Sequence, residues 1–107
     1  MIGSGTVVGP GGAGEVETVD GFLLILSRWA IEELRFDETL APGFHGYDAD
    51  LCFQARERGR KVAVADLNVE HHHQWPKLSS FGYRAGWKRA NVAFRRKWEG
   101  RMPLRVI

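Results

Sequence analysis

The chain has 107 residues, 44% of them hydrophobic and 26% charged, with a net charge of +2, which predicts one small globular domain of ordinary composition. Its single cysteine, Cys52, excludes an internal disulfide and favours a reducing compartment with a buried thiol, and no apolar run approaches the ~20 residues of a membrane-spanning helix. The start lacks a cationic segment followed by an apolar run, so the sequence predicts no signal peptide and a cytoplasmic protein.

Residues 1–14 contain six glycines, too many for a stable helix or strand interior. No strand precedes these glycines and no Gly-Lys-Ser/Thr follows them, so they do not predict a phosphate-binding loop. We expect residues 1–14 to be a flexible leader or an active-site loop, and residues 15–107 to be the folded subdomain.

A strand over residues 15–27 is the first predicted element. The continuous apolar run of residues 22–26 is typical of a strand covered on both faces. Just before this run, Gly21 in the pair Asp20-Gly21 would let a ligand approach closely, and a simple bend into the strand explains the same pair. Ser27 can cap a short helix over residues 28–34.

A helix over residues 48–58, ended by Gly59, is predicted next. A strand over residues 61–65 follows, and a second short strand over residues 67–69 leads to three histidines. The last predicted element is an amphipathic helix over residues 79–98 with an aromatic and a basic face.

The charge of the chain is unevenly distributed. Residues 77–107 carry nine basic side chains and one acidic side chain, a net charge of +8, whereas residues 1–76 carry six and twelve, a net charge of −6. We expect the aromatic face of the last helix in a core or an interface. Its basic face, within residues 84–105, is either solvated surface or a site for phosphates, a nucleic-acid backbone or an anionic membrane surface.

Asp48 is the candidate general base, because activation of a hydroxyl needs a carboxylate held on a rigid element. Asp48 also suits the start of a helix as a cap, a role that does not exclude catalysis. Asp50 cannot share a helical face with Asp48, because two residues rotate the chain by about 200°.

The histidine run allows two interpretations. Neutral imidazole binds borderline metals, and on a strand His71 and His73 point to the same side while His72 points to the other. Nothing else in the sequence has the spacing of a metal site. The run is therefore either a surface cluster without metal or the source of one ligand that acts with carboxylates from elsewhere.

Taken in order, five segments within residues 16–104 resemble those of family 2 glycosyltransferases. Tyr47 departs from the family pattern, which usually has Glu there, and Gln54 or Arg56 must replace the usual Arg. The matching segments are residues 19–25 (the acceptor-side strand), 36–38 (F-D-E), 46–59 (E-D-x-D-L-x-x-R-x-x-x-x-G), 69–71 (a strand followed by histidine) and 94–98 with Pro103 (F-x-x-K-W and a later proline).

This resemblance implies a GT-A fold, a nucleotide-diphosphate sugar as donor, a glycan or lipid-linked acceptor and, in many relatives, Mg²⁺ or Mn²⁺. By position, Asp48 would deprotonate the acceptor hydroxyl, and His71 would touch the metal or the diphosphate. The substrate contacts implied by the resemblance are Asp20, Gly21, Tyr47 and Asp50.

The nucleotide-binding βαβ units of that family have no counterpart in these residues. We therefore expect an α/β chain that is a truncated GT-A-like half, with a small mixed sheet of three or four strands and about three helices, inactive by itself. An open sheet edge favours a homodimer or a partner chain that completes the sheet. The alternative is a non-enzymatic binding module or structural homodimer, and the basic helix makes the inner face of the membrane a second expected location.

Overall fold

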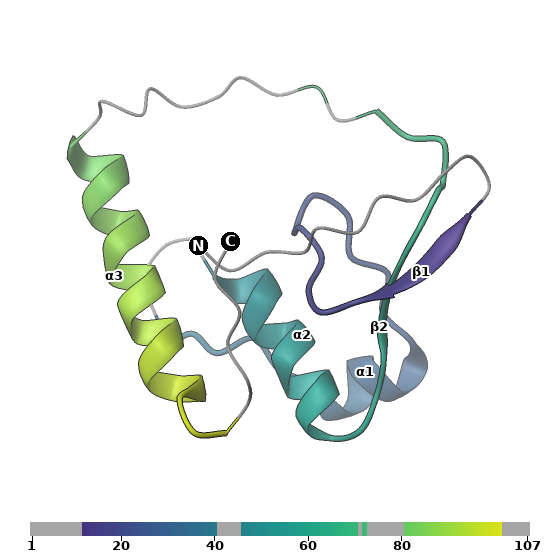
Figure 1. Ribbon diagram of the computed structural model, residues 1–107, viewed down its shortest axis with the longest axis horizontal. Coiled ribbons are helices and arrows are strands. Elements are labelled where there is room, and N and C mark those ends of the chain that lie inside the picture. Colours follow the sequence, from purple (N-terminus) through teal and green to yellow (C-terminus); the bar gives the residue numbers. More distant parts are fainter. Residues whose placement is uncertain (1–11, 41–45, 71, 73–80, 102–107) are drawn as a thin grey trace.

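The computed structural model describes residues 12–40, 46–70, 72 and 81–101, and for residues 81–83 it describes the backbone alone. These residues form a mixed α/β fold with three helices, as the sequence predicts (Figure 1). In chain order the elements are β1 (Ala13–Val16), α1 (Arg28–Glu33), α2 (Tyr47–Glu57), β2 (Val62–Ala65) and α3 (Phe81–Trp98).

β1 and β2 form a two-stranded antiparallel sheet in which Ala13 lies opposite Ala65 and Val16 opposite Val62. The described part therefore has two strands, fewer than the three or four expected. The predicted strand over residues 67–69 is wrong for a local reason. The Asp66 carboxylate accepts the Asn68 N–H at 2.9 Å, and Asn68 has a φ of 54°, so the chain turns here instead of staying extended.

The predicted buried strand over residues 22–26 is also wrong. This segment joins no strand in the described part, and four of its five side chains are exposed, with Ile25 reaching 74%. Leu24 alone packs against the core. A strand needs a neighbouring backbone to pair its N–H and C=O groups, and β2 supplies one only for residues 13–16.

The expected start of α1 is confirmed. Ser27 Oγ accepts the Ala30 N–H at 3.2 Å, which satisfies one of the free donors of the first turn. Ala30 and Leu34 then pack against Leu51 and Ala55 of α2 in one buried cluster.

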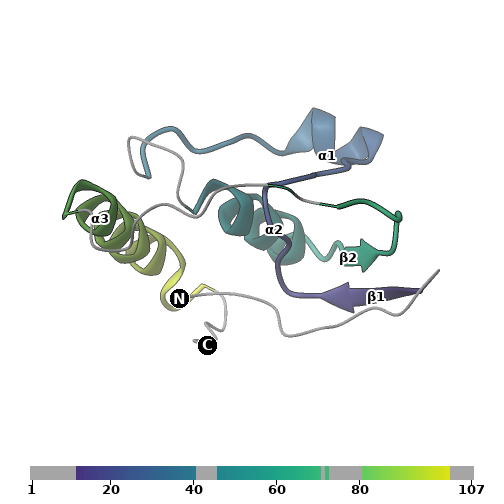
Figure 2. The same cartoon turned by 90° about the horizontal axis from the view of Figure 1, so that it is seen from above.

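α2 is the central element, with α3 on one side and α1 and the sheet on the other (Figures 1 and 2). Gly46 precedes it with a φ of +85°, and Gly59 follows it with a φ of +79°, so glycine stands at both points where the backbone is left-handed. Toward α3, the Phe53 ring packs edge-on against Phe94 and Trp98, with centroid distances of 5.0 and 5.5 Å.

The aromatic face of α3 contributes to the core, as expected, through Phe94 and Trp98, which are 2% and 0% exposed. Trp87 is half-buried, and the side chain of Tyr83 lies outside the described residues. No helix in the described ranges is long and apolar enough to cross a membrane.

The glycine-rich segment at the start is mostly outside the described residues, which begin at position 12. β1 starts at Ala13, two residues before the predicted strand. The division of the chain at residue 14 stays a prediction.

Candidate functional site

Two segments that are distant in the sequence meet at the start of α2. The Gly21 N–H donates a 2.8 Å hydrogen bond to Asp48 Oδ2, across 27 positions of the chain. The other oxygen, Asp48 Oδ1, accepts the Ala49 N–H at 2.8 Å. These two donors fix the orientation of the half-buried Asp48 carboxylate.

Gly46, not Asp48, occupies the capping position of α2. Its left-handed backbone turns the chain into the helix, and its carbonyl accepts the Asp50 N–H at 2.9 Å. The capping role considered for Asp48 is therefore not observed. Asp48 lies in the first turn instead, where the helix dipole stabilises negative charge.

Tyr47 covers the other side of Gly21. A Cβ atom on Gly21 would collide with the Tyr47 hydroxyl and the adjacent ring carbons, so only glycine leaves room for this ring. Phe36 packs edge-on against the Tyr47 ring at a centroid distance of 5.9 Å. Burial raises the pKa of Tyr47, and the charges of Asp48 and Asp20 raise it further, so the hydroxyl stays a donor at neutral pH.

Four predicted site residues thus lie together: Asp20, Gly21, Tyr47 and Asp48. The Asp20 carboxylate accepts the Phe22 N–H at 3.3 Å and remains exposed. Each Asp48 oxygen has a second acceptor position beyond the one used by its backbone donor. The half-buried Asp48 carboxylate therefore retains acceptor positions for a further hydrogen bond.

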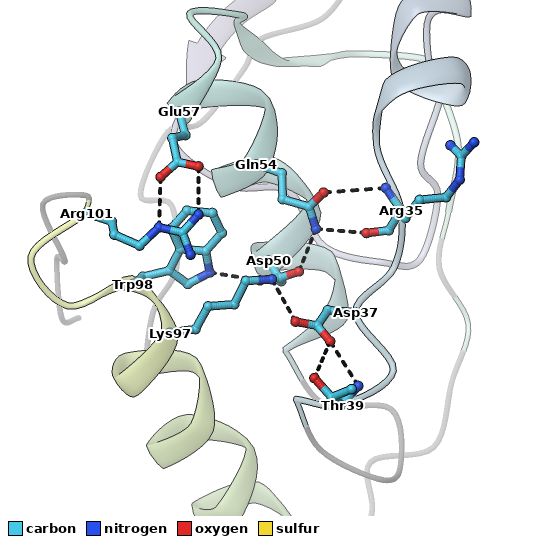
Figure 3. Close-up of polar contacts among 9 residues, drawn as sticks. All are labelled: Arg35, Asp37, Thr39, Asp50, Gln54, Glu57, Lys97, Trp98 and Arg101. Carbon is cyan, nitrogen blue, oxygen red and sulfur yellow. Dashed lines mark hydrogen bonds and ion pairs between the residues drawn. The ribbon is translucent and has the colours of Figure 1, made fainter.

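Asp50 lies on a different side of α2, as the rotation of about 200° predicts. Its side chain is 1% exposed, and Oδ1 accepts hydrogen bonds from Trp98 Nε1 and Lys97 Nζ, both at 2.8 Å (Figure 3). Gln54 Nε2 donates to Oδ2 at 2.8 Å. This burial favours a structural role for Asp50 over the predicted substrate contact.

Lys97 joins Asp50 to Asp37, whose Oδ2 lies 2.9 Å from the ammonium group. Hydrogen bonds from Thr39 and Lys97 lower the pKa of Asp37 to about 2. Burial opposes the charge of Lys97, but the hydrogen bonds to Asp50 and Asp37 outweigh it and raise the Lys97 pKa. No local sequence signal indicated this three-residue charge cluster, although its members lie in segments 36–38, 46–59 and 94–98 of the resemblance.

Gln54 extends the same network toward the end of α1. Its Nε2 donates to the Arg35 carbonyl at 2.8 Å, and its Oε1 accepts the Arg35 N–H at 3.4 Å. Farther along α2, Glu57 pairs with both ends of the Arg101 guanidinium at 2.8 and 2.9 Å, and Arg101 stacks on Trp98. α2 is therefore held on the side opposite Asp48 by polar contacts along its whole length.

Part of the chain is similar in sequence to one curated protein. Over 59 residues it is 42% identical to the streptomycin biosynthesis protein StrF from Streptomyces griseus. The match covers 55% of this chain and 21% of StrF, so the chain spans about one fifth of that relative. No family model matches the chain, and no solved structure matches it significantly.

The predicted metal ligand, His71, lies outside the described residues, so its role stays a prediction. His72 is described, exposed, and 2.9 Å from Glu70 through its Nε2. In the described ranges, no group of three or more His, Cys, Asp or Glu side chains could hold a metal ion. This part of the chain therefore supplies no ligand set for Mg²⁺ or Mn²⁺.

Cys52 faces the same side as Asp48, one helical turn later, and is 6% exposed. Burial raises its thiol pKa, an effect larger than the opposing hydrogen bond with the Val19 backbone. A buried thiol with a raised pKa is a poor nucleophile. The expected buried thiol is confirmed.

Proposed function

We propose that this chain is the acceptor-side part of a family 2 glycosyltransferase-like domain, which serves the transfer of a sugar from a nucleotide-diphosphate sugar to an acceptor hydroxyl. The Asp48–Gly21 hydrogen bond carries the proposal. It joins the two segments in which the resemblance expects the base and the substrate contacts. The similarity to StrF, named for a role in streptomycin biosynthesis, supports a biosynthetic function.

In the proposed reaction, the acceptor oxygen attacks the anomeric carbon of the donor sugar in a single displacement with inversion. The bond from that carbon to the diphosphate breaks, and the nucleotide diphosphate leaves with the electron pair. Asp48 takes the acceptor proton, while Gly21 and Ala49 hold its carboxylate in place. The neighbouring Tyr47 hydroxyl and Asp20 carboxylate are suited to hydrogen bonds with sugar hydroxyls.

The resemblance to family 2 glycosyltransferases also implies a divalent metal ion with His71 among its ligands. Because the described residues supply no ligand set for it, no step of this mechanism runs through a metal. The donor nucleotide and the acceptor, glycan or lipid-linked, are likewise proposed from the resemblance alone.

The first test is isothermal titration of the chain with UDP, GDP and their sugar conjugates, with and without Mn²⁺. Amide NMR spectra recorded during the same titrations locate the bound molecule. Because the nucleotide-binding units have no counterpart in these residues, we expect the sugar conjugates to bind more tightly than UDP or GDP alone and to shift the Gly21 and Asp48 amide signals. No heat and no shift at millimolar concentration with any of these ligands would contradict the proposal.

A matched pair of variants then distinguishes the loss of a catalytic base from the loss of one negative charge. Asp48→Asn keeps an oxygen that can accept the Gly21 N–H but cannot act as a base, and Glu38→Gln removes one negative charge from an exposed side chain. Where transfer is measurable, Asp48→Asn should reduce it by about 100-fold or more with binding retained, and Glu38→Gln should leave it unchanged. Equal activity of the two variants would exclude Asp48 as the base.

A further inference from the structure

The outward face of α3 is strongly cationic. The sequence of this helix, residues 81–98, contains no aspartate or glutamate. Figures 1 and 2 show α3 at the outer edge of the molecule, with α2 on its inner side. Its exposed basic side chains are Arg84, Lys88, Arg89, Arg95 and Arg96.

Four of these cations stand apart from the ion pairs of the described residues. Lys97, on the inner side, pairs with Asp37 and Asp50, whereas Lys88, Arg89, Arg95 and Arg96 form no ion pair with any described residue. Their charges are therefore available to an external anion.

The four cations surround one exposed apolar side chain, Val92, which is 50% exposed. On a helix the surface neighbours of a residue lie three and four positions away on either side. For Val92 these positions are occupied by Arg89 and Lys88 before it and by Arg95 and Arg96 after it. An apolar centre with a complete cationic border results.

A shallow open depression lies on this face, lined by Lys88, Arg89, Val92, Ala93 and Arg96. Its lining is mostly apolar, from Val92, Ala93 and the aliphatic stems of the three cations. Long basic side chains of this kind lay their stems on apolar surface and extend their charged ends toward anions.

We propose that this face of α3, the Val92 face, binds the surface of an anionic lipid bilayer. The cations would contact lipid phosphates and carboxylates, while Val92 and the stems rest at the boundary between headgroups and acyl chains. Two of the aromatic side chains of α3 that could stack nucleic-acid bases, Phe94 and Trp98, are instead buried in the core. A flat bilayer surface can contact α3 alone at the edge of the molecule. This suits the charge distribution, because the first 76 residues carry a net charge of −6 and would be repelled by an anionic surface.

The test is flotation of the full chain with phosphatidylcholine vesicles that contain or lack phosphatidylserine, at low and high salt. Arg89→Gln/Arg96→Gln removes two cations from the Val92 face. Arg28→Gln/Lys61→Gln lowers the net charge by the same amount at exposed sites elsewhere. We expect salt-sensitive binding to the anionic vesicles alone, a loss of about 25-fold in partition for the first double variant, and little change for the second. Equal losses in both would overturn the proposal.

Two further measurements distinguish a bilayer from another polyanion. Val92→Ser keeps every charge and should weaken vesicle partition by about threefold to fivefold. Fluorescence anisotropy with duplex DNA and single-stranded RNA, at the same ionic strength, should show weaker binding than the vesicles. Unchanged partition of Val92→Ser, or tighter binding to a nucleic acid than to the vesicles, would reject a lipid surface. Circular dichroism would show that each variant is folded.

Discussion

At the scale of single residues, the contact between Gly21 and Tyr47 gives a sharp prediction. Gly21→Ala should destabilise the chain by about 1–2 kcal/mol, because the new methyl group occupies the position of the Tyr47 hydroxyl. In a Tyr47→Ala background the same substitution should cost close to nothing, because the colliding atoms are gone. Urea unfolding of the four proteins in this double-mutant cycle measures the coupling. Additive effects of the two substitutions would show that a methyl group at position 21 does not collide with the Tyr47 ring in solution.

Asp37 gives a second prediction at this scale, in the dependence of stability on pH. Its pKa in the folded chain is about 2, below the ordinary value of 3.8, so the folded state favours its charged form. This stabilisation is present above pH 4 and is lost as the pH falls through about 2. It amounts to at most about 2 kcal/mol. Urea unfolding between pH 7 and pH 2 should show this loss in the wild type and not in Asp37→Asn; parallel curves would contradict the prediction.

At the scale of elements, local signals predicted the helices well. Ser27 begins α1 and Gly59 follows α2, because caps depend on neighbours within a few positions. Strands depend on distant partners, and the apolar run of residues 22–26 does not indicate whether such a partner exists. The same limit applies to the site. The Asp48 position follows from a local motif, whereas the buried contact of Asp50 joins residues 48 positions apart and left no local signal.

Two polar links hold α2 to the end of the described chain, one from Asp50 to Lys97 and Trp98 in α3 and one from Glu57 to Arg101 just after it, and they should differ in importance because they differ in burial. Asp50→Ala would leave Lys97 and the Trp98 Nε1 donor without their buried acceptor, at a cost of about 3–5 kcal/mol. Glu57→Ala removes an acceptor at the surface, where solvent replaces it, and should cost little.

Urea unfolding of the two variants makes this comparison. Where Asp50→Ala does not fold, Asp50→Asn, which retains an acceptor for Trp98, should fold with intermediate stability. Equal stability of Asp50→Ala and Glu57→Ala would show that the buried contacts of Asp50 with Lys97 and Trp98 do not hold α2 and α3 together.

At the scale of the whole molecule, the exposed apolar run of residues 22–26 predicts association. Phe22, Leu23, Ile25 and Leu26 are 37–74% exposed and form a contiguous apolar stretch that joins no described strand. We expect a second copy of the chain to cover this run, because apolar surface on this scale is unfavourable in water. Sedimentation velocity at increasing concentration should then show a monomer–dimer equilibrium.

Ile25→Lys should shift this equilibrium to the monomer, because it places a charge in the centre of the proposed contact. Ile31→Lys is the matched control, since Ile31 is 62% exposed on α1, outside the run, and gains the same charge. A monomer at every concentration would leave the run to a different partner chain, and dissociation by both variants alike would point to a contact other than residues 22–26. Loss of the dimer in Ile25→Lys alone would place the interface on the segment where the sequence predicted a buried strand.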